Sequence, residues 1–425
     1  MTYTIAVVHS PKLARDRSRD WYRYYAGYSP EFVRDVLEIL EVDAEDPVLD
    51  PWNGSGTTTS VAHAIGVPSL GFDANPALVV IARSRLLGRD VVDSIEPLLS
   101  DLLDHAASDT ASVTPPDDPL VDWFSDGTAS DLRRIERSIH HVLVSSNPDS
   151  RTTMLDTDKV STLAAFFYVA LFDVVRSALR AFVGSNPTWV KTPPGNDRRV
   201  LKPVDLASTF NAAVARLRFI VEQATVSEAG PSALIGLATS TSLPLLPKSV
   251  AAVVSSPPYC TRIDYVMATR PELAVLGYTN DAITTLRATM LGTPTMTQQV
   301  PNVMDEWGGT AAELIRQVST HSSRASGTYY RKYFLQYLGT LWESLSELRR
   351  VLRDGGSICL VVQDSYYKDL SVDLARIITE MFATLGLAPA SLHLFSVPAT
   401  KAAIHPGSKK WRKTFSAMES VLIFN

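Results

Sequence analysis

The sequence predicts an α/β protein with a doubly wound, Rossmann-like parallel sheet and a largely helical insertion. Short apolar runs bounded by turn residues alternate with amphipathic helical segments near both ends of the chain, which is the pattern of βαβ units. The first two apolar runs are joined by a glycine-rich loop and a helix, and the second run ends in an acidic residue. The length of 425 residues exceeds that of a simple domain and leaves room for insertions.

The N-terminal part contains the start of this sheet. A helix over 29–42 is expected because Ser29 stands at the N-cap, Pro30 lies in the first turn and apolar residues follow at helical spacing. The elements that follow are a strand at 47–50, a helix at 60–66, a strand at 69–73 and a helix at 75–88. Together they form a strand–loop–helix–strand unit, the beginning of a doubly wound sheet.

The rest of the chain alternates core elements with two insertions. Residues 95–228 are expected to be mainly helical, and the helix at 160–184 is apolar on most sides, which places it against the core. The stretch 265–325 is polar and marked by Pro and Gly, so we expect an irregular loop insertion there. Further expected elements are strands at 233–237, 249–255, 357–363, 391–397 and 419–425 and helices at 333–352 and 370–386. Residues 1–94 and 229–425 would then form the two halves of one domain around a helical insertion at 95–228.

The composition is that of a globular protein, with 45% hydrophobic and 20% charged residues. No apolar run reaches the roughly 18–20 residues of a membrane helix, and the first residues lack a signal-peptide layout, so we expect a soluble, intracellular protein. The net charge of −5 argues against a generally basic, nucleic-acid-coating protein. A local basic groove remains open, because basic stretches with aromatic residues occur at 11–25, 186–203, 322–334 and 405–413.

Cysteine and histidine usage excludes two further classes. The only two cysteines, Cys260 and Cys359, rule out a disulfide framework and a cysteine-rich zinc site. The eight histidines are scattered, and the neighbouring His140 and His141 cannot share one helix face. We therefore expect no metal centre.

The segment "DPWNGSGTTT" (50–59) lies between a predicted strand and a predicted helix. Gly54 and Gly56 permit backbone torsions that other residues resist, and they let a ligand approach the main chain. The helix N-terminus behind the loop offers N–H groups to an anion, and Asp73 lies at the end of the next strand, where such folds place an acid on ribose hydroxyls. No lysine follows the second glycine, so this is not a phosphate loop. The pattern favours a nucleoside ligand without a polyphosphate, such as S-adenosylmethionine, over a purely structural turn.

The segment "VVSSPPYC" (253–260) ends another predicted strand in an unusual way. Branched apolar residues give way to serines, prolines and a tyrosine, and a prolyl pair cannot donate to a sheet ladder. This turn is either a plain strand end or the working edge of an enzyme.

Both segments, together with "GFDANP" (71–76), resemble the S-adenosylmethionine-dependent amino-methyltransferases of DNA, which methylate cytosine N4 or adenine N6. The family's cofactor loop usually reads Asp-Pro-Phe-x-Gly-Ser-Gly-Thr, and Trp52 here replaces the phenylalanine. Its catalytic motif is Ser, Asp or Asn followed by Pro-Pro and an aromatic residue. With flanking elements the resemblance covers roughly half of the chain. It implies a Rossmann-like methyltransferase sheet, S-adenosylmethionine as cofactor and double-stranded DNA as substrate.

The resemblance also assigns roles in the turn. The Ser256 side chain and the Pro257 carbonyl would hold the two N–H groups of the target amine, Pro258 would stiffen the turn, and Tyr259 would stack on a base flipped out of the duplex. The methyl group would pass directly to the amine without a covalent enzyme intermediate. Cys260 is then an ordinary small residue rather than a nucleophile.

Further residues follow from the same resemblance. The chain at 24–37 is similar to the family's extra motif before the cofactor loop, although a helix cap explains Ser29 equally well, and Thr239 and Ser240 stand where the family usually has an acidic residue near the adenine. The implied cofactor-binding residues are Tyr28, Ser29, Asp50, Pro51, Asn53, Gly54, Gly56, Thr57, Thr58, Asp73, Ala74, Thr239 and Ser240. The DNA-binding candidates are Trp189, Lys191, Arg198, Arg199, Arg262, Tyr265, Lys409 and Lys410. An Arg262–Asp264 ion pair is the alternative for the loop after the turn.

Several functional alternatives remain open. Serine at position 256 favours the N4-cytosine members, whereas N6-adenine members more often have Asp or Asn there. An RNA or protein-glutamine methyltransferase shares the Pro-Pro-Tyr turn, and a non-catalytic nucleic-acid-binding protein is a third class. In the favoured interpretation, 1–94 and 229–425 form the catalytic domain and 95–228 the target-recognition region. We expect a prokaryotic cytoplasmic enzyme of the restriction–modification type. A cognate restriction endonuclease is a candidate partner, although the sequence does not say whether one exists.

Overall fold

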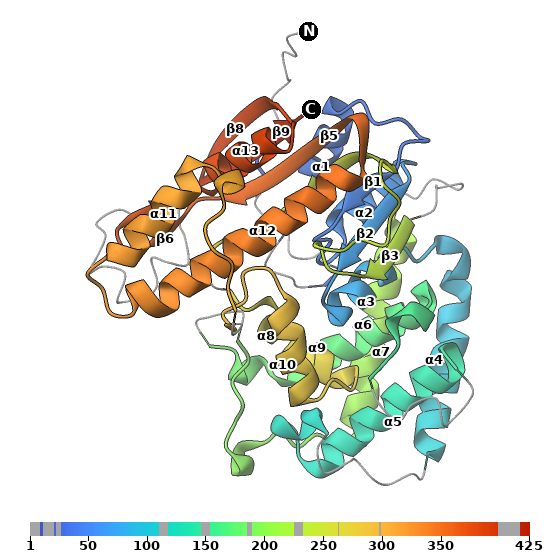
Figure 1. Cartoon of the computed structure of the whole chain (residues 1–425). Helices are drawn as coiled ribbons and strands as arrows, with labels where there is room; N and C mark the ends of the chain where they lie inside the picture. Colours follow the sequence, from blue (N-terminus) through green and yellow to red (C-terminus); the bar gives the residue numbers. More distant parts are fainter. Residues whose placement is uncertain are drawn as a thin grey trace.

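A computed structural model describes residues 9–11, 21–22, 27–109, 118–145, 154–184, 189–224, 233–261, 263–296, 299–397 and 417–425. At its centre lies a seven-stranded sheet in the order β3-β2-β1-β4-β5-β9-β8 (Figure 1). The first five strands are parallel, β9 is antiparallel to β5, and β8 is antiparallel to β9. In sheet order the strands are β3 Ala233–Leu237, β2 Ser69–Asp73, β1 Val48–Asp50, β4 Val250–Ser255, β5 Leu352–Gln363, β9 Ala417–Phe424 and β8 Pro389–Val397. The predicted Rossmann-like α/β sheet is confirmed.

Helices cover both faces of the sheet, as its alternating side chains require. On one face α1 and α2 share a hydrophobic cluster with Val254 and Val361. On the other face α11, α12 and α13 share a cluster with Val253 and Leu360. These helices span α1 Pro30–Ile39, α2 Thr57–Ala64, α11 Gly309–Thr320, α12 Arg331–Val351 and α13 Leu374–Thr384, and α3 Pro76–Ser84 connects β2 to the helical part. The sheet is therefore wound on both sides.

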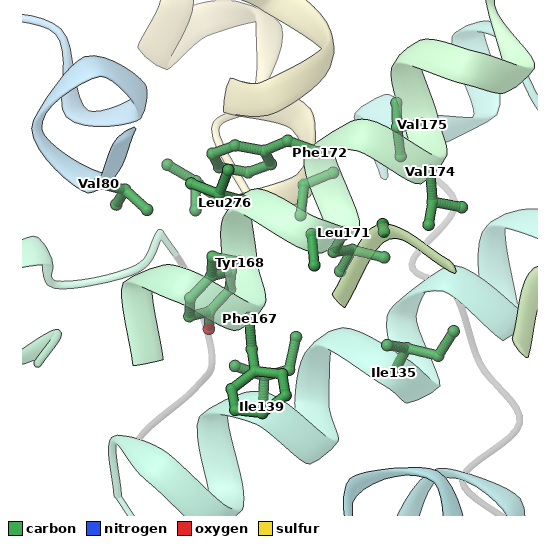
Figure 2. Close-up of a cluster of buried hydrophobic side chains, with 14 of the residues drawn as sticks. Val80, Ile135, Ile139, Phe167, Tyr168, Leu171, Phe172, Val174, Val175 and Leu276 are labelled. Atoms are coloured by element: carbon green, nitrogen blue, oxygen red, sulfur yellow. The ribbon is translucent and has the colours of Figure 1, made fainter. Parts of the chain in front are cut away.

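A group of long helices lies beyond the β3 edge of the sheet (Figure 1). Its members are α4 Val92–Ser108, α5 Asp126–Leu143, α6 Thr162–Ala178 and α7 Pro203–Gln223. Helix α6 lies at the centre, and Phe167, Tyr168 and Leu171 are completely buried among side chains of α3 and α5 (Figure 2). The predicted burial of this helix is confirmed. Because the cluster includes α3, its core is continuous with the sheet, and the boundary at residue 95 stays a prediction.

The stretch 265–325 differs from the irregular insertion expected above. It contains the helices α8 Tyr265–Ala268, α9 Arg270–Val275, α10 Asn280–Thr289 and α11, followed by a π-helix at Ser326–Tyr330. The side chains of Asp264 and Thr279 accept backbone N–H groups at the starts of α8 and α10. Leu314 and Val318 of α11 are buried against α12 and α13. Helices therefore form in this stretch despite its Pro and Gly residues, because side chains cap the helix starts and α11 has an apolar face.

Two smaller differences concern the C-terminal part. Strand β5 begins at Leu352, directly after α12, and a short hairpin of β6 Ser365–Tyr367 and β7 Leu370–Val372 precedes α13. The hairpin occupies the first residues of the helix expected at 370–386. In the part of the chain that the structure describes, no helix is long and apolar enough to span a bilayer.

Candidate active site

The two motif-bearing loops lie side by side at the carboxyl edge of the sheet. Strand β1 pairs in parallel with both β2 and β4, so the loop after Asp50, the Asp73 turn and the turn after Ser255 all leave the same edge. This edge is the usual ligand site of open parallel sheets.

The loop between β1 and α2 is shaped by its two glycines. Gly54 and Gly56 have φ values of 52° and 81°, in the left-handed region that favours glycine. A Cβ at Gly56 would lie 2.8 Å from the Cβ of Ala82, so the loop packs directly against α3. No side chain caps α2 at Gly56, and the first N–H groups of the helix are left for main-chain or ligand acceptors.

Asn53 is a loop-shaping residue in this structure. Its Oδ1 accepts a hydrogen bond from Thr59 Oγ1 at 3.1 Å. A Cβ added to Gly71 would lie only 2.5 Å from Asn53 Nδ2, so the Asn53 side chain packs directly against this glycine. The side chain therefore points into the β2 strand, and its N–H and carbonyl close the loop through Phe72 and Gly56.

The Asp73 carboxylate holds the loop from the neighbouring strand. Its Oδ2 accepts the Gly54 N–H at 2.9 Å, and its Oδ1 accepts the Asn75 N–H at 2.8 Å. Burial raises the pKa of this carboxyl to about 6, although both N–H groups act in the opposite direction. Each oxygen keeps a further lone pair with which it can accept a hydrogen bond from a ligand hydroxyl.

A buried polar cluster joins the two loops. Asp50 Oδ1 accepts a hydrogen bond from Ser255 Oγ at 2.5 Å, and its Oδ2 accepts hydrogen bonds from Thr58 Oγ1 at 2.6 Å and Tyr28 Oη at 3.1 Å. Burial raises the pKa of the Asp50 carboxyl. Because Asp50 and Thr58 are almost completely buried, their side chains support the loop from behind.

The other predicted cofactor residues also have defined places. Ser29 Oγ accepts the Phe32 N–H, which makes it the cap of α1, as the alternative above proposed. Ser240 is buried after β3 and its Oγ lies 2.8 Å from that of Ser344 in α12, whereas Thr239 is half-buried. Pro51 is buried, and Thr57 and Ala74 are half-buried at the carboxyl edge of β1 and β2.

The Ser-Pro-Pro-Tyr turn follows β4 directly. Ser256 Oγ donates to the Val361 carbonyl at 2.8 Å, which uses its hydrogen and leaves its lone pairs to accept. The Pro258 carbonyl is taken by Tyr337 Oη at 2.8 Å. Among the described residues, no hydrogen bond reaches the Pro257 carbonyl. Ser256 is half-buried and Pro257 is buried at the end of β4, and their predicted role as the two acceptors stays a prediction.

Tyr259 is held at its hydroxyl and is half-buried. The hydroxyl donates to Glu419 Oε1 at 3.3 Å and lies 3.4 Å from Ser256 Oγ. Burial, reinforced by the Glu419 carboxylate, raises the pKa of the Tyr259 phenol, so it stays neutral. Burial likewise raises the pKa of the adjacent Cys260 thiol, which opposes formation of a nucleophilic thiolate.

The sequence did not single out Ser255, Glu419 or Tyr337, although all three contact site residues. Ser255 carried one usable signal, because it is a polar residue at the end of a predicted apolar strand, directly before the turn. Glu419 and Tyr337 carried none, since each lies far along the chain from the turn. Within the described ranges, no group of three or more His, Cys, Asp or Glu side chains is arranged to bind a metal ion.

The structure describes some of the DNA-binding candidates and not others. Trp189, Lys191 and Arg199 are exposed on the segment before α7, and Arg198 approaches Asp126 at 4.0 Å. This segment is tied to α9 by a hydrogen bond from Arg270 to Thr192 (3.2 Å), so it is connected to the chain that follows the turn. Arg262, Lys409 and Lys410 lie outside the described residues.

Tyr265 begins α8, shortly after the turn. Burial raises the pKa of its phenol to about 12. The neighbouring Asp264 caps α8 and forms an ion pair with Arg287 of α10 at 2.7 Å. Asp264, the acid of the alternative Arg262–Asp264 ion pair, is therefore already paired with Arg287.

Comparisons with known proteins point in one direction. No protein family's sequence profile matches the chain. The chain is 23% identical over 293 residues to the type II methyltransferase M.BsoBI of Geobacillus stearothermophilus, a match that covers 64% of this chain and 55% of the relative. It is 31% identical over 70 residues to the type II methyltransferase M2.LlaDCHI of Lactococcus lactis subsp. cremoris, which covers 16% of this chain and 26% of the relative. The chain thus spans little more than half of one relative and about a quarter of the other, and both relatives are named type II methyltransferases.

Proposed function

We propose that this protein is a site-specific DNA methyltransferase that transfers a methyl group from S-adenosylmethionine to the N4 amine of cytosine in duplex DNA. The observation that carries the proposal is the pair of acceptors at Ser256 and Pro257, held beside the glycine loop by the Asp50–Ser255 hydrogen bond. The type II methyltransferase names of the two relatives support the same class of activity.

The residues at the carboxyl edge fit S-adenosylmethionine. Helix α2 begins without a side-chain cap, so its N–H groups are suited to the methionine carboxylate. Asp73 ends the neighbouring strand, at the place where an acid accepts ribose hydroxyls. When bound, the cofactor supplies an electrophilic methyl group on its sulfonium.

The turn would prepare the target amine for attack. An exocyclic base amine is a weak nucleophile because its lone pair is delocalised into the ring. Ser256 Oγ and the Pro257 carbonyl accept its two N–H groups, which favours a pyramidal nitrogen with a localised lone pair. With the cofactor bound, the N–C bond would form as the S–C bond of the sulfonium breaks, and the methylated nitrogen would release one proton to solvent. Tyr259 stacks on the flipped base.

N6 methylation of adenine is the second candidate, because the same two acceptors suit either amine. Serine at position 256 supports cytosine. We also propose that the 189–199 segment, with Trp189, Lys191, Arg198 and Arg199, contacts DNA and that the helical insertion 95–228 reads the target. A cognate restriction endonuclease is the proposed partner, and the prokaryotic cytoplasm the proposed location.

Mass spectrometry of nucleosides tests the proposal directly. Duplex DNA treated with the protein and labelled S-adenosylmethionine should contain N4-methylcytosine, and RNA should stay unlabelled. N6-methyladenine instead would replace the cytosine assignment with the adenine one. Cofactor and DNA binding without any methylated nucleoside would favour the non-catalytic alternative.

Variants of the turn test the assigned roles. Ser256→Ala should lower kcat by about 100-fold, the order expected for one aligned hydrogen-bonding group in a transition state. Tyr259→Ala should lower kcat/KM for DNA by about 10-fold or more, because base stacking contributes roughly 1–3 kcal/mol. Both should bind S-adenosylmethionine normally in calorimetry. Cys260→Ala is the matched control and should keep turnover within about threefold, a difference of under 1 kcal/mol. Full activity of Tyr259→Ala would refute the stacking role.

A further inference from the structure

A surface at the start of α12 combines cations, tyrosines and unusual backbone. We call it the α12 entry surface and define it by Arg324, Tyr329, Tyr330, Arg331, Lys332 and Lys368. Arg324 and Lys332 are exposed, and the other four are half-buried. Five of its residues lie in the basic stretch 322–334, and none of the six has been given a role above.

The backbone of this surface is strained at two places. Ala325 and Lys368 have φ values of 64° and 58°, in the left-handed region that residues with a Cβ rarely adopt. Between Ala325 and α12 the chain forms a π-helix, Ser326–Tyr330. Non-glycine residues with left-handed backbone angles concentrate at functional sites, and so do π-helical turns. Here both occur on one surface.

Internal contacts hold the surface in one shape. Tyr367 Oη lies 2.9 Å from Ser323 Oγ and 2.5 Å from Ser326 Oγ, which ties the β6–β7 hairpin to the π-helix. The rings of Tyr330 and Tyr367 are 4.8 Å apart, and Lys368 Nζ lies 5.8 Å from the centre of the Tyr330 ring. These hydrogen bonds and ring contacts therefore fix the backbone segments that carry the cationic side chains.

The surface lies next to the Ser-Pro-Pro-Tyr turn. Tyr337 of α12 donates to the Pro258 carbonyl, and Arg331 precedes Tyr337 by six residues, or about 9 Å along the helix axis at 1.5 Å per residue. From the hairpin, Ser365 Oγ donates to the Cys260 carbonyl at 3.0 Å. A macromolecule with one group in the turn would thus be in reach of the α12 entry surface.

Three of the four cations on this surface have no acidic partner among the described residues. Within the described residues, Arg324, Arg331 and Lys332 form no ion pair, whereas Arg350, Arg353 and Lys248 on the same domain are paired with acids. The nearby Asp369 is bound to His321. Uncompensated cations in a chain of net charge −5 favour a strongly anionic ligand.

We propose that the α12 entry surface binds the phosphate backbone of duplex DNA beside the target base. The proposal rests on the function proposed above, since the adjacent turn makes a nucleic acid the expected anion. Arg324, Arg331 and Lys332 contact phosphates, and the tyrosines give the surface its shape. These contacts position the duplex and do not read its sequence.

The test is the salt dependence of DNA binding. Arg324→Ala/Lys332→Ala should weaken binding of a fluorescently labelled duplex by about 10-fold at 50 mM salt and should reduce the log–log salt slope by about 1.8, or 0.9 for each lost phosphate contact. The charge-keeping variant Arg324→Lys/Lys332→Arg should retain most of the slope. S-adenosylmethionine affinity and the urea midpoint should not change.

The matched control is Lys248→Ala/Arg353→Ala. It also removes two positive charges, but these residues lie near the starts of β4 and β5, at the opposite edge of the sheet from the turn. Its salt slope should equal that of the unaltered protein. Equal slopes for the test and control variants would overturn the proposal, and so would tighter binding of an acidic peptide than of the duplex.

Failure of the proposed function is distinguishable in the same series. If the unaltered protein binds duplex DNA but methylates no nucleoside, the catalytic proposal fails, and the slope difference still decides the binding surface. If the unaltered protein does not bind duplex DNA at all, both proposals fail.

Discussion

Replacement of Gly56 by alanine is the sharpest test of the loop geometry. The residue has a φ of 81° at the start of α2 and packs against α3. An added Cβ would stand 2.8 Å from the Cβ and 2.9 Å from the Cα of Ala82, whereas carbon atoms prefer separations of roughly 3.5–4.0 Å. Neither atom belongs to a flexible side chain, so the loop or α3 must shift.

The size of the effect follows from two contributions. A residue with a Cβ in the left-handed region costs roughly 1–2 kcal/mol. Overpacking of a tight contact costs roughly a further 1–3 kcal/mol. We therefore expect Gly56→Ala to lower the free energy of unfolding by about 2–5 kcal/mol. Because the shift displaces the loop, S-adenosylmethionine affinity should fall by about 10-fold or more, equivalent to roughly 1.4 kcal/mol.

Urea denaturation and titration calorimetry measure these two effects. Gly127→Ala is the matched control, because Gly127 lies in the first turn of α5 and an added Cβ there meets nothing within 4 Å. That change should raise stability by about 0.5–1 kcal/mol and leave cofactor affinity unchanged. A Gly56→Ala protein as stable as the unaltered one, with normal affinity, would refute the assigned loop geometry.

Two further predictions concern buried charges. The Asp73 carboxyl has a folded-state pKa of about 6 and an ordinary value of 3.8, so the folded protein binds more protons between these values. Its contribution to stability is therefore lost as pH rises, by about 2.4 kcal/mol between pH 4 and 7. Asp73→Asn should lack this component in paired urea titrations, and identical pH profiles would contradict the pKa shift. Glu272 is completely buried and accepts hydrogen bonds from Arg176 and Tyr22. Glu272→Gln should cost about 3–5 kcal/mol, because it leaves the guanidinium without its counter-charge, and a loss below about 1 kcal/mol would show that the pair is dispensable.

The sequence was most informative where a signal is local. The loop 50–59 could be placed because a strand, two glycines and a helix follow one another within ten residues, and the structure shows the required positive φ values at Gly54 and Gly56. The burial of α6 was predictable from its continuous apolar surface. The helices in 265–325 were missed because their caps are single residues among many Pro and Gly signals.

What the sequence by itself determined is the α/β fold class, the order of the main elements and the two motifs that end β1 and β4. These depend on periodicity and on turn residues a few positions apart, which act before the chain is folded. Only the tertiary structure decided which side chains meet. Asp50 bonds Ser255 across 205 positions, and Tyr259 bonds Glu419 across 160. Such pairings depend on strand order and register, which no local pattern specifies. The sequence marked the basic stretch at 322–334, but only the tertiary structure placed it beside the hairpin and near the turn.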